Sequence, residues 1–134
     1  MASDAPPAPW LVLSLDIDGT LEFGEPPGPI PVSTVLALQR SGVVVGSASD
    51  RLPADQRRLW RNTEVQVSFA VAKHTLSGLL DGFRPHPAIH IGDGIGDRLL
   101  ARAAGVRFIA VHECSAADWR DIELVKKTLK ERIR

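Results

Sequence analysis

The chain has 134 residues, which fits one domain and is long enough to bury roughly two-thirds of its unfolded surface. Hydrophobic residues make up 44% of it and charged residues 24%, and 16 Lys and Arg balance 16 Asp and Glu, so the formal net charge is zero. This balance argues against nucleic acid or an anionic membrane as a bulk partner, although it leaves room for a local charged patch.

The cysteine content and the N-terminal residues bear on the cellular compartment. Cys114 is the only cysteine, so no intrachain disulfide can form, and no Cys and His residues have the spacing of a zinc site. No apolar run approaches the ~20 residues that span a bilayer. The first residues lack the basic and apolar regions of a secretory signal. We therefore expect a cytoplasmic protein with a short loose tail over residues 1–8.

Apolar runs alternate with amphipathic stretches along the chain. The first run, residues 10–17, is nearly continuous, as in a strand that is buried on both faces. In chain order the pattern predicts strand 10–17, loop 22–31, helix 33–40, strand 43–45, helix 53–60, strand 65–71, helix 73–80, strand 88–91, helix 97–104, strand 106–111 and helix 116–134. This β–α repeat predicts a single α/β domain over residues 1–134, a Rossmann-like three-layer domain whose five-stranded parallel sheet has helices on both faces.

Polar residues follow four of the five predicted strands. In chain order these are Asp16, Asp18, Ser47, Lys73, Asp93 and Asp97. Parallel sheets bind ligands beyond the carboxyl ends of their strands, so we expect these side chains to converge at one edge. Carboxylates gathered there would repel one another, and a hard divalent cation such as Mg²⁺ resolves that conflict. A lysine and a hydroxyl beside them suit a phosphoryl group.

Each of these residues also has a plain structural interpretation when taken alone. Asp18 with Gly19 is typical of a turn, and Asp97 could cap a helix. Ser47 could be a loop hydroxyl and Lys73 a solvated lysine. These separate interpretations do not explain why all the residues occur in this order, each at the end of a predicted strand.

The order of these motifs resembles that of the haloacid dehalogenase superfamily, and in particular its phosphatase branch. The first motif, Asp16-Ile17-Asp18-Gly19-Thr20, and the segment from Gly92-Asp93 to Asp97 carry most of the resemblance, with Ser47 and Lys73 between them. The match runs from Trp10 to about Val111. The true dehalogenases of the superfamily lack the second aspartate, so Asp18 implies phosphoryl transfer.

The resemblance implies a reaction in which both aspartates of the first motif take part. Asp16 would attack phosphorus to form an aspartyl-phosphate, which water then cleaves. It needs no activating base, because an ordinary aspartate is ionised at neutral pH. Asp18 would protonate the leaving oxygen and later take a proton from the attacking water, which contributes roughly 10²–10⁴-fold.

The remaining motif residues receive binding roles from the same resemblance. Mg²⁺ would be held by Asp16, the main-chain carbonyl of Asp18 and Asp93, with Asp97 behind them orienting the site. The phosphoryl oxygens would be held by Ser47, Lys73 and the backbone N–H groups of residues 17–19, Gly19 among them.

The chain departs from many members of the superfamily because it leaves no room for a cap domain. Residues 22–31 form only a Pro- and Gly-rich loop, and residues 51–64 hold little more than one helix. This resembles a capless member. Such members often act on large phosphorylated molecules or borrow a neighbouring subunit as a lid. The expected partner is therefore a phosphorylated substrate, small or macromolecular, and a homo-oligomer, in which a second copy of the chain supplies the lid, is the alternative to a large substrate.

Several alternatives remain open at this stage. The leading interpretation is a phosphohydrolase that cleaves phosphate monoesters. A phosphotransferase could use the same aspartyl-phosphate, and a catalytically weak binding or regulatory module could keep the fold. Four arginines, Arg51, Arg57, Arg58 and Arg61, could form a basic rim, but a solvated helix face is the preferred interpretation. None of the histidines has ligand spacing, and we assign them no role.

Overall fold

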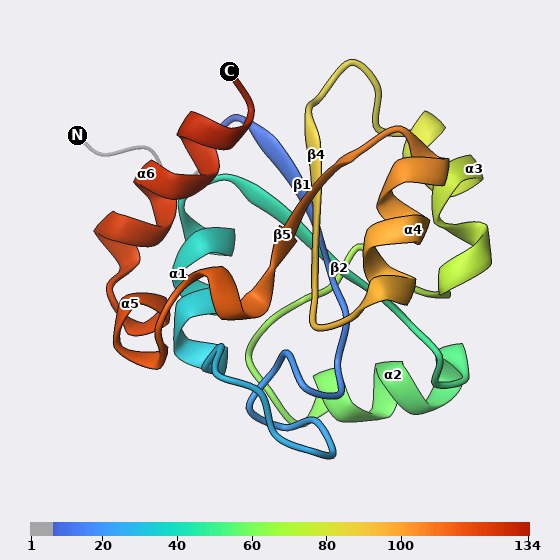
Figure 1. Ribbon diagram of the computed structural model, residues 1–134, viewed down its shortest axis with the longest axis horizontal. Helices are drawn as coiled ribbons and strands as arrows, with labels where there is room; N and C mark the ends of the chain where they lie inside the picture. The colour runs from blue at the N-terminus through green and yellow to red at the C-terminus, as the bar shows by residue number, and fades with distance from the viewer. Residues whose placement is uncertain (1–6) are drawn as a thin grey trace.

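A single parallel β-sheet organises the computed structural model of the chain, which describes residues 7–134 (Figure 1). Its strands are β1 (Leu11–Leu15), β2 (Val43–Ser49), β3 (Phe69–Ala72), β4 (Ala88–Gly92) and β5 (Arg107–Ala110). They lie in the order β3-β2-β1-β4-β5, and every neighbouring pair is parallel. The predicted five-stranded parallel sheet is confirmed.

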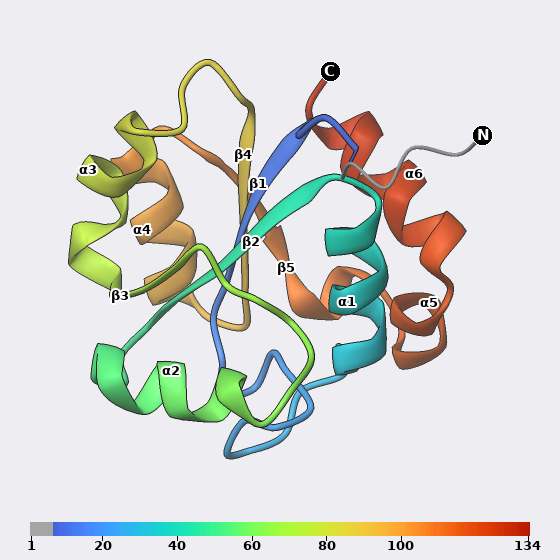
Figure 2. The same cartoon turned by 180° about the vertical axis from the view of Figure 1, so that it is seen from behind.

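Helices cover both faces of this sheet. They are α1 (Val32–Arg40), α2 (Pro53–Arg61), α3 (Leu76–Asp81), α4 (Ile95–Ala104), α5 (Ala116–Arg120) and α6 (Ile122–Arg132). Figures 1 and 2 show α1, α5 and α6 on one face and α3 and α4 on the other, while α2 lies across the end of β2. The tail predicted for residues 1–8 falls largely outside the described residues. Among those described, none of the helices has the length and apolar character needed to cross a membrane.

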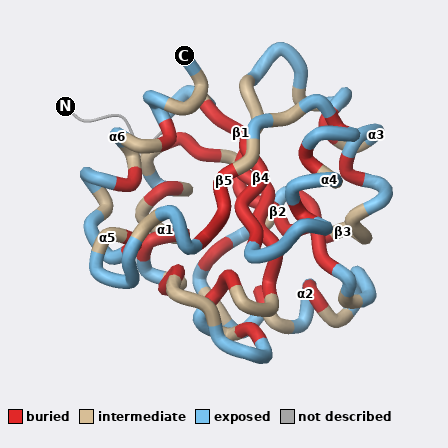
Figure 3. Tube along the Cα trace, viewed as in Figure 1, coloured by how far each residue is buried: buried red, intermediate tan, exposed pale blue. Residues whose placement is uncertain are grey.

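The alternation of side chains along β1 decides which face carries the polar residues. Leu11, Leu13 and Leu15 belong to the larger core cluster, which also contains residues of α1, α5 and α6. Val12 belongs to the second cluster, with residues of α3. Because side chains alternate along a strand, Ser14 and then Asp16 continue on the face of Val12. Figure 3 shows the strands buried at the centre of the molecule.

The final helix and the third strand differ clearly from the sequence prediction. The predicted final helix is two helices, and they meet at Asp121, whose backbone is extended and whose carboxylate accepts the N–H of Leu124. The predicted strand 65–71 is shorter and later, because ladder pairing begins only at Phe69. Val65 is still buried in the core, so its apolar character reflects packing rather than strand pairing.

Candidate active site

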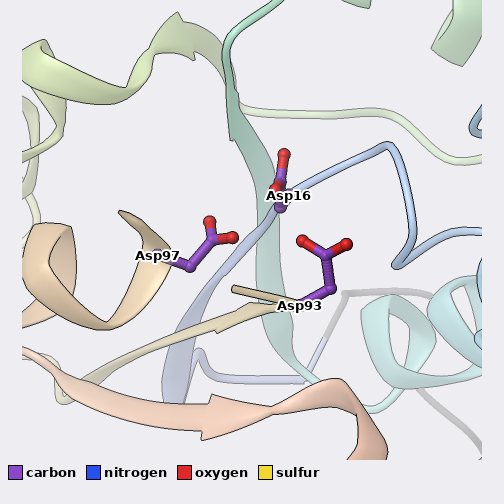
Figure 4. A group of neighbouring side chains, drawn as sticks. All are labelled: Asp16, Asp93 and Asp97. Carbon is purple, nitrogen blue, oxygen red and sulfur yellow. The ribbon is translucent and has the colours of Figure 1, made fainter. Parts of the chain in front are cut away.

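Three aspartates meet beyond the carboxyl ends of β1 and β4. Asp16 directly follows β1, Asp93 directly follows β4, and Asp97 lies in the first turn of α4. Each offers one carboxylate oxygen, and these oxygens lie within 4.8 Å of one another (Figure 4). The chain proceeds outward from β1 to β2 and β3, and then returns to place β4 and β5 on the other side of β1. The aspartates therefore occupy the switch point of the sheet, where parallel α/β folds bind ligands.

Lys73 brings a positive charge into the group of aspartates. It is the first residue after β3, and its Nζ lies 3.2 Å from Asp16 Oδ2, 3.3 Å from Asp97 Oδ1 and 3.5 Å from Asp50 Oδ2. Burial would lower the pKa of Lys73, but the charges of Asp16 and Asp97 outweigh it and raise the pKa above its usual value. Lys73 is therefore a firmly held ammonium group.

Two glycines allow the carboxylates to come this close. Gly19 has a φ of +76°, and a Cβ there would overlap the carboxylate of Asp93. Gly92 ends β4, and a Cβ there would overlap the side chain of Asp97. Larger residues at either position would push a carboxylate out of the group.

The carboxylates of Asp16 and Asp97 share one environment but differ in their pKa values. Burial, followed by the charge of Asp97, raises the pKa of Asp16 to about 7. Burial would also raise the pKa of Asp97, but the hydrogen bonds from His90 and Asp16 and the charge of Lys73 together outweigh it and lower the pKa to about 2. Without a cation, Asp16 therefore keeps a proton near neutral pH. The expectation that Asp16 is ionised like an ordinary aspartate does not hold for the metal-free chain.

This donor set fits a hard divalent cation. Asp16 and Asp97 are buried, whereas Asp93 is exposed and leaves an approach from solvent. A cation that binds oxygens of Asp16 and Asp93 would relieve their repulsion and favour loss of the proton from Asp16. Mg²⁺ is suited to such a site, because it takes few protein carboxylates and keeps positions for water and phosphate oxygens.

A buried histidine, to which we assigned no role from the sequence, forms a hydrogen bond with the carboxylate of Asp97. His90 Nε2 lies 2.7 Å from Asp97 Oδ1, and His90 Nδ1 lies 2.8 Å from Ser14 Oγ, with all three residues at most 1% exposed. Because ionised Asp97 can only accept, His90 Nε2–H is the donor to Asp97, and His90 Nδ1 shares a hydrogen bond with the Ser14 hydroxyl. Ser14 and His90 are paired in register across β1 and β4. In the sequence, the one sign of this contact was a polar residue within each of two apolar strands.

The structure does not bring Ser47 to the carboxylates. Its hydroxyl donates to Gln56 Oε1 at 2.7 Å and accepts the Trp60 indole N–H at 2.9 Å, and the residue is fully buried. The reason is that β2 runs to Ser49 instead of ending before Ser47, and Ser47 pairs with Leu15, one residue short of Asp16. Ser49, at the end of the strand, is the hydroxyl that occupies the predicted position.

The loop of residues 22–31 engages the first motif. The N–H of Gly19 donates to the carbonyl of Pro26 at 2.7 Å, so this N–H is not free for the phosphate role predicted for it. Asp18 Oδ1 accepts the N–H of Glu25 at 2.7 Å. The Pro-rich loop is thus tied by hydrogen bonds to both residues.

Arg51 holds the carboxylate of Asp18 from the other side. Its Nη2 lies 2.9 Å from Asp18 Oδ1, and its Nε lies 3.0 Å from Oδ2. Burial would raise the pKa of Asp18, but the Arg51 guanidinium and the Glu25 N–H outweigh it and hold the pKa below its usual value. Arg51 is therefore part of the site, and the preferred interpretation of a solvated helix face was wrong for this residue.

Comparison with known proteins supports the fold. No protein-family model and no curated protein matches the chain. Among solved structures, the chain is similar to the NMR structure of the core domain of a candidate phosphoglycolate phosphatase from Streptococcus pneumoniae TIGR4. That match has a TM-score of 0.53 and 17% sequence identity, and it covers 75% of this chain and 78% of the other. The likeness shows a shared α/β fold.

Because folded Asp16 keeps a proton near neutral pH, we predict that the stability of the metal-free chain depends on pH. Between about pH 4 and pH 7, folded Asp16 holds a proton that the unfolded chain releases, so the free energy of unfolding should fall as pH rises through this window. The expected loss is roughly 2–4 kcal/mol. Urea unfolding with a chelator present, at pH steps from 4 to 8, measures it.

The matched variant for this experiment is Asp16→Asn, which cannot titrate. Its stability should change less across the same window, because the group that binds the extra proton in the folded state has been removed. An identical pH slope in wild type and Asp16→Asn would show that Asp16 does not hold the proton.

Proposed function

We propose that this chain is a Mg²⁺-dependent phosphohydrolase that cleaves phosphate monoesters through an aspartyl-phosphate on Asp16. The observation that carries the proposal is the meeting of Asp16, Asp93, Asp97 and Lys73 at the switch point of a parallel sheet. The likeness in fold to a phosphatase core domain and the resemblance of the motifs to the haloacid dehalogenase superfamily support it.

Asp16 is assigned the role of nucleophile. One oxygen accepts the N–H of Ile17 at 2.8 Å, and the other faces Lys73. Once ionised, Asp16 attacks phosphorus, a bond forms between its oxygen and phosphorus, and the ester oxygen leaves. Water then attacks phosphorus, which releases inorganic phosphate and restores the carboxylate.

The metal would be held by Asp16, Asp93 and the main-chain carbonyl of Asp18. When bound, Mg²⁺ supplies positive charge that stabilises the phosphoryl oxygens in the transition state. Asp97, which His90 and Lys73 hold in place, would orient the residues that bind the metal.

Three groups are assigned to the phosphoryl oxygens. Lys73 supplies a cation, Ser49 replaces Ser47 as the hydroxyl at the end of β2, and the N–H of Asp18 replaces that of Gly19. Within residues 7–134, the Asp18 N–H makes no hydrogen bond, so it is available as a donor. Donors directed at charge that develops in the transition state are a large source of rate acceleration.

Asp18 is assigned the proton transfers. In the ligand-free chain Arg51 keeps it ionised, the form that accepts a proton from the attacking water. A phosphoryl anion beside Asp18 favours its protonated form, which the departing oxygen needs in the first step. The same residues serve a phosphotransferase. We favour hydrolysis because Asp93 is exposed and water therefore reaches the site.

Coverage of the site by something other than a cap domain is part of the proposal. Residues 22–31 are tied to Asp18 and Gly19, and residues 51–64 hold α2. We propose that either a large phosphorylated substrate or a second copy of the chain covers the site during turnover and supplies the contacts to the substrate away from phosphorus.

The proposal predicts that turnover of a phosphate monoester requires both Asp16 and Mg²⁺. Asp16→Asn removes the nucleophile and should lower kcat by at least about a thousandfold. Asp93→Asn should mainly weaken the affinity for Mg²⁺, by roughly 10–100-fold. Release of phosphate from p-nitrophenyl phosphate, measured across a Mg²⁺ titration, tests both variants.

Asp81→Asn is a suitable control for this experiment, because Asp81 is exposed and pairs with Arg84 on the surface. It should match the wild type. Full activity in EDTA, or in Asp16→Asn, would contradict the proposal.

A second prediction separates the two aspartates of the first motif. Asp18→Asn keeps the main-chain carbonyl but cannot exchange protons, so breakdown of the aspartyl-phosphate should slow by roughly 10²-fold or more. With a substrate that has a good leaving group, rapid quench and mass measurement should show phosphate accumulating on Asp16. A steady-state rate equal to that of the wild type would exclude Asp18 as the acid–base residue.

A further inference from the structure

Arg51 lies beside the site at the point where solvent reaches Asp18. It falls between β2 and α2, and its Nε and Nη2 contact the Asp18 carboxylate at 2.9–3.1 Å. The side chains of Arg51 and Asp18 are 31% and 35% exposed. A positive charge thus borders the residue to which the proposed function assigns the leaving oxygen.

The backbone of Arg51 is fixed on both sides. Its N–H donates to Ser49 Oγ at 3.0 Å, and its carbonyl accepts Gln56 Nε2 at 2.8 Å. Gln56 is fully buried and is held in turn by Ser47 and by the carbonyl of Val71. The guanidinium is therefore presented from a rigid support, which reduces the entropy lost when it binds a ligand.

The guanidinium has hydrogen-bonding capacity left after it binds Asp18. Arginine carries five N–H donors, and Nε–H with one N–H of Nη2 forms the edge that faces Asp18. The other N–H of Nη2 and both N–H groups of Nη1 have no partner among residues 7–134. This second edge presents parallel donors, the arrangement that binds a carboxylate or a phosphate through two hydrogen bonds.

We propose that Arg51 is a specificity-determining residue that binds a second anionic group, a carboxylate or a further phosphate, in the leaving-group part of the substrate. One edge of the guanidinium keeps Asp18, and the other receives this anion. The preferred substrates are thus phosphate monoesters with a second negative charge a few bonds from the ester oxygen. This inference rests on the proposed function, because Asp18 marks the side on which the leaving group lies.

Other charged residues near the site bear on whether Arg51 or another group binds the second anion. The hydrogen bond to Asp18 raises the pKa of Arg51, and the nearby acidic side chains of Asp55 and Glu25 add to that rise. Asp55 is itself paired with Arg58 at 3.2 Å. These charges oppose a general attraction for anions, so the second anion must touch Arg51 directly. Arg98 is a competing cation, since it lines a hollow of about 170 Å³ beside Asp93.

Three esters with the same carbon chain test the inference. They are propyl phosphate, 3-(phosphonooxy)propanoate and propane-1,3-diol bisphosphate, which carry no second anion, a carboxylate and a second phosphate. With saturating Mg²⁺, the wild type should show a kcat/KM roughly ten- to a hundredfold higher for at least one of the two esters with a second anionic group than for propyl phosphate. Which arm is preferred distinguishes carboxylate from phosphate.

Variants of Arg51 should remove this preference. In Arg51→Gln the ratio of kcat/KM between the anionic and neutral esters should fall to about one. The ratio within one variant cancels any effect of the substitution on the chemical step. Arg51→Lys keeps the charge but lacks the second edge, so it should also lose most of the preference. Thermal unfolding confirms that each variant is folded, and the lysine variant serves if the glutamine variant is not.

Two control variants lose the same charge elsewhere. Arg58→Gln, on the exposed surface of α2, and Arg98→Gln, beside Asp93, should both keep the preference. Loss of the preference in either control, its survival in both Arg51 variants, or its absence from the wild type would overturn the inference. Asp16-dependent turnover without a preference would overturn this inference alone, whereas no Asp16-dependent turnover of any ester would overturn the proposed function and the inference with it.

Discussion

The repulsion between carboxylates at the end of β1 is the constraint on which the rest of the site depends. Asp16 and Asp97 are both buried, and burial, followed by the charge of Asp97, raises the pKa of Asp16 to about 7. The charge of Lys73 and the N–H of Ile17 offset part of this shift, but not enough to ionise Asp16 fully at neutral pH. In the folded chain a cation would therefore switch Asp16, the proposed nucleophile, to its reactive form.

The fold creates this constraint through the register of its central strands. Because β1 lies between β2 and β4, the residues just after β1 and β4 are neighbours at the switch point. The pairing of Ser14 with His90 then places the imidazole one layer behind the carboxylates. Its hydrogen bonds to Ser14 and Asp97 satisfy both ring nitrogens in the core, where an unpaired polar group would be costly.

The sequence was informative wherever position relative to a strand end was enough. Asp16, Asp93, Asp97 and Lys73 follow strands of a parallel sheet, so their convergence could be predicted from the β–α repeat and the motif order. The phosphate role predicted for Ser47 is not supported, because it depended on ending β2 a few residues too early. Boundaries of this kind depend on pairing with neighbouring strands.

Contacts between distant segments could not be predicted from the sequence. The N–H of Gly19 is taken by Pro26 through the path of the Pro-rich loop, and Arg51 reaches Asp18 from a segment 33 residues away. Neither contact leaves a periodic pattern in the sequence from which it could be predicted. His90 was a different case, since a histidine within an apolar strand is a visible anomaly, and only its register partner Ser14 explains it.

The proton released when Mg²⁺ binds tests the central claim most directly. Calorimetric titration of Mg²⁺ at pH 7, repeated in buffers with different ionisation enthalpies, counts that proton. With the pKa of Asp16 at about 7, binding should release roughly half a proton per ion, falling toward zero near pH 9 and in Asp16→Asn. Binding without proton release at pH 7, or no binding of Mg²⁺, would contradict the account.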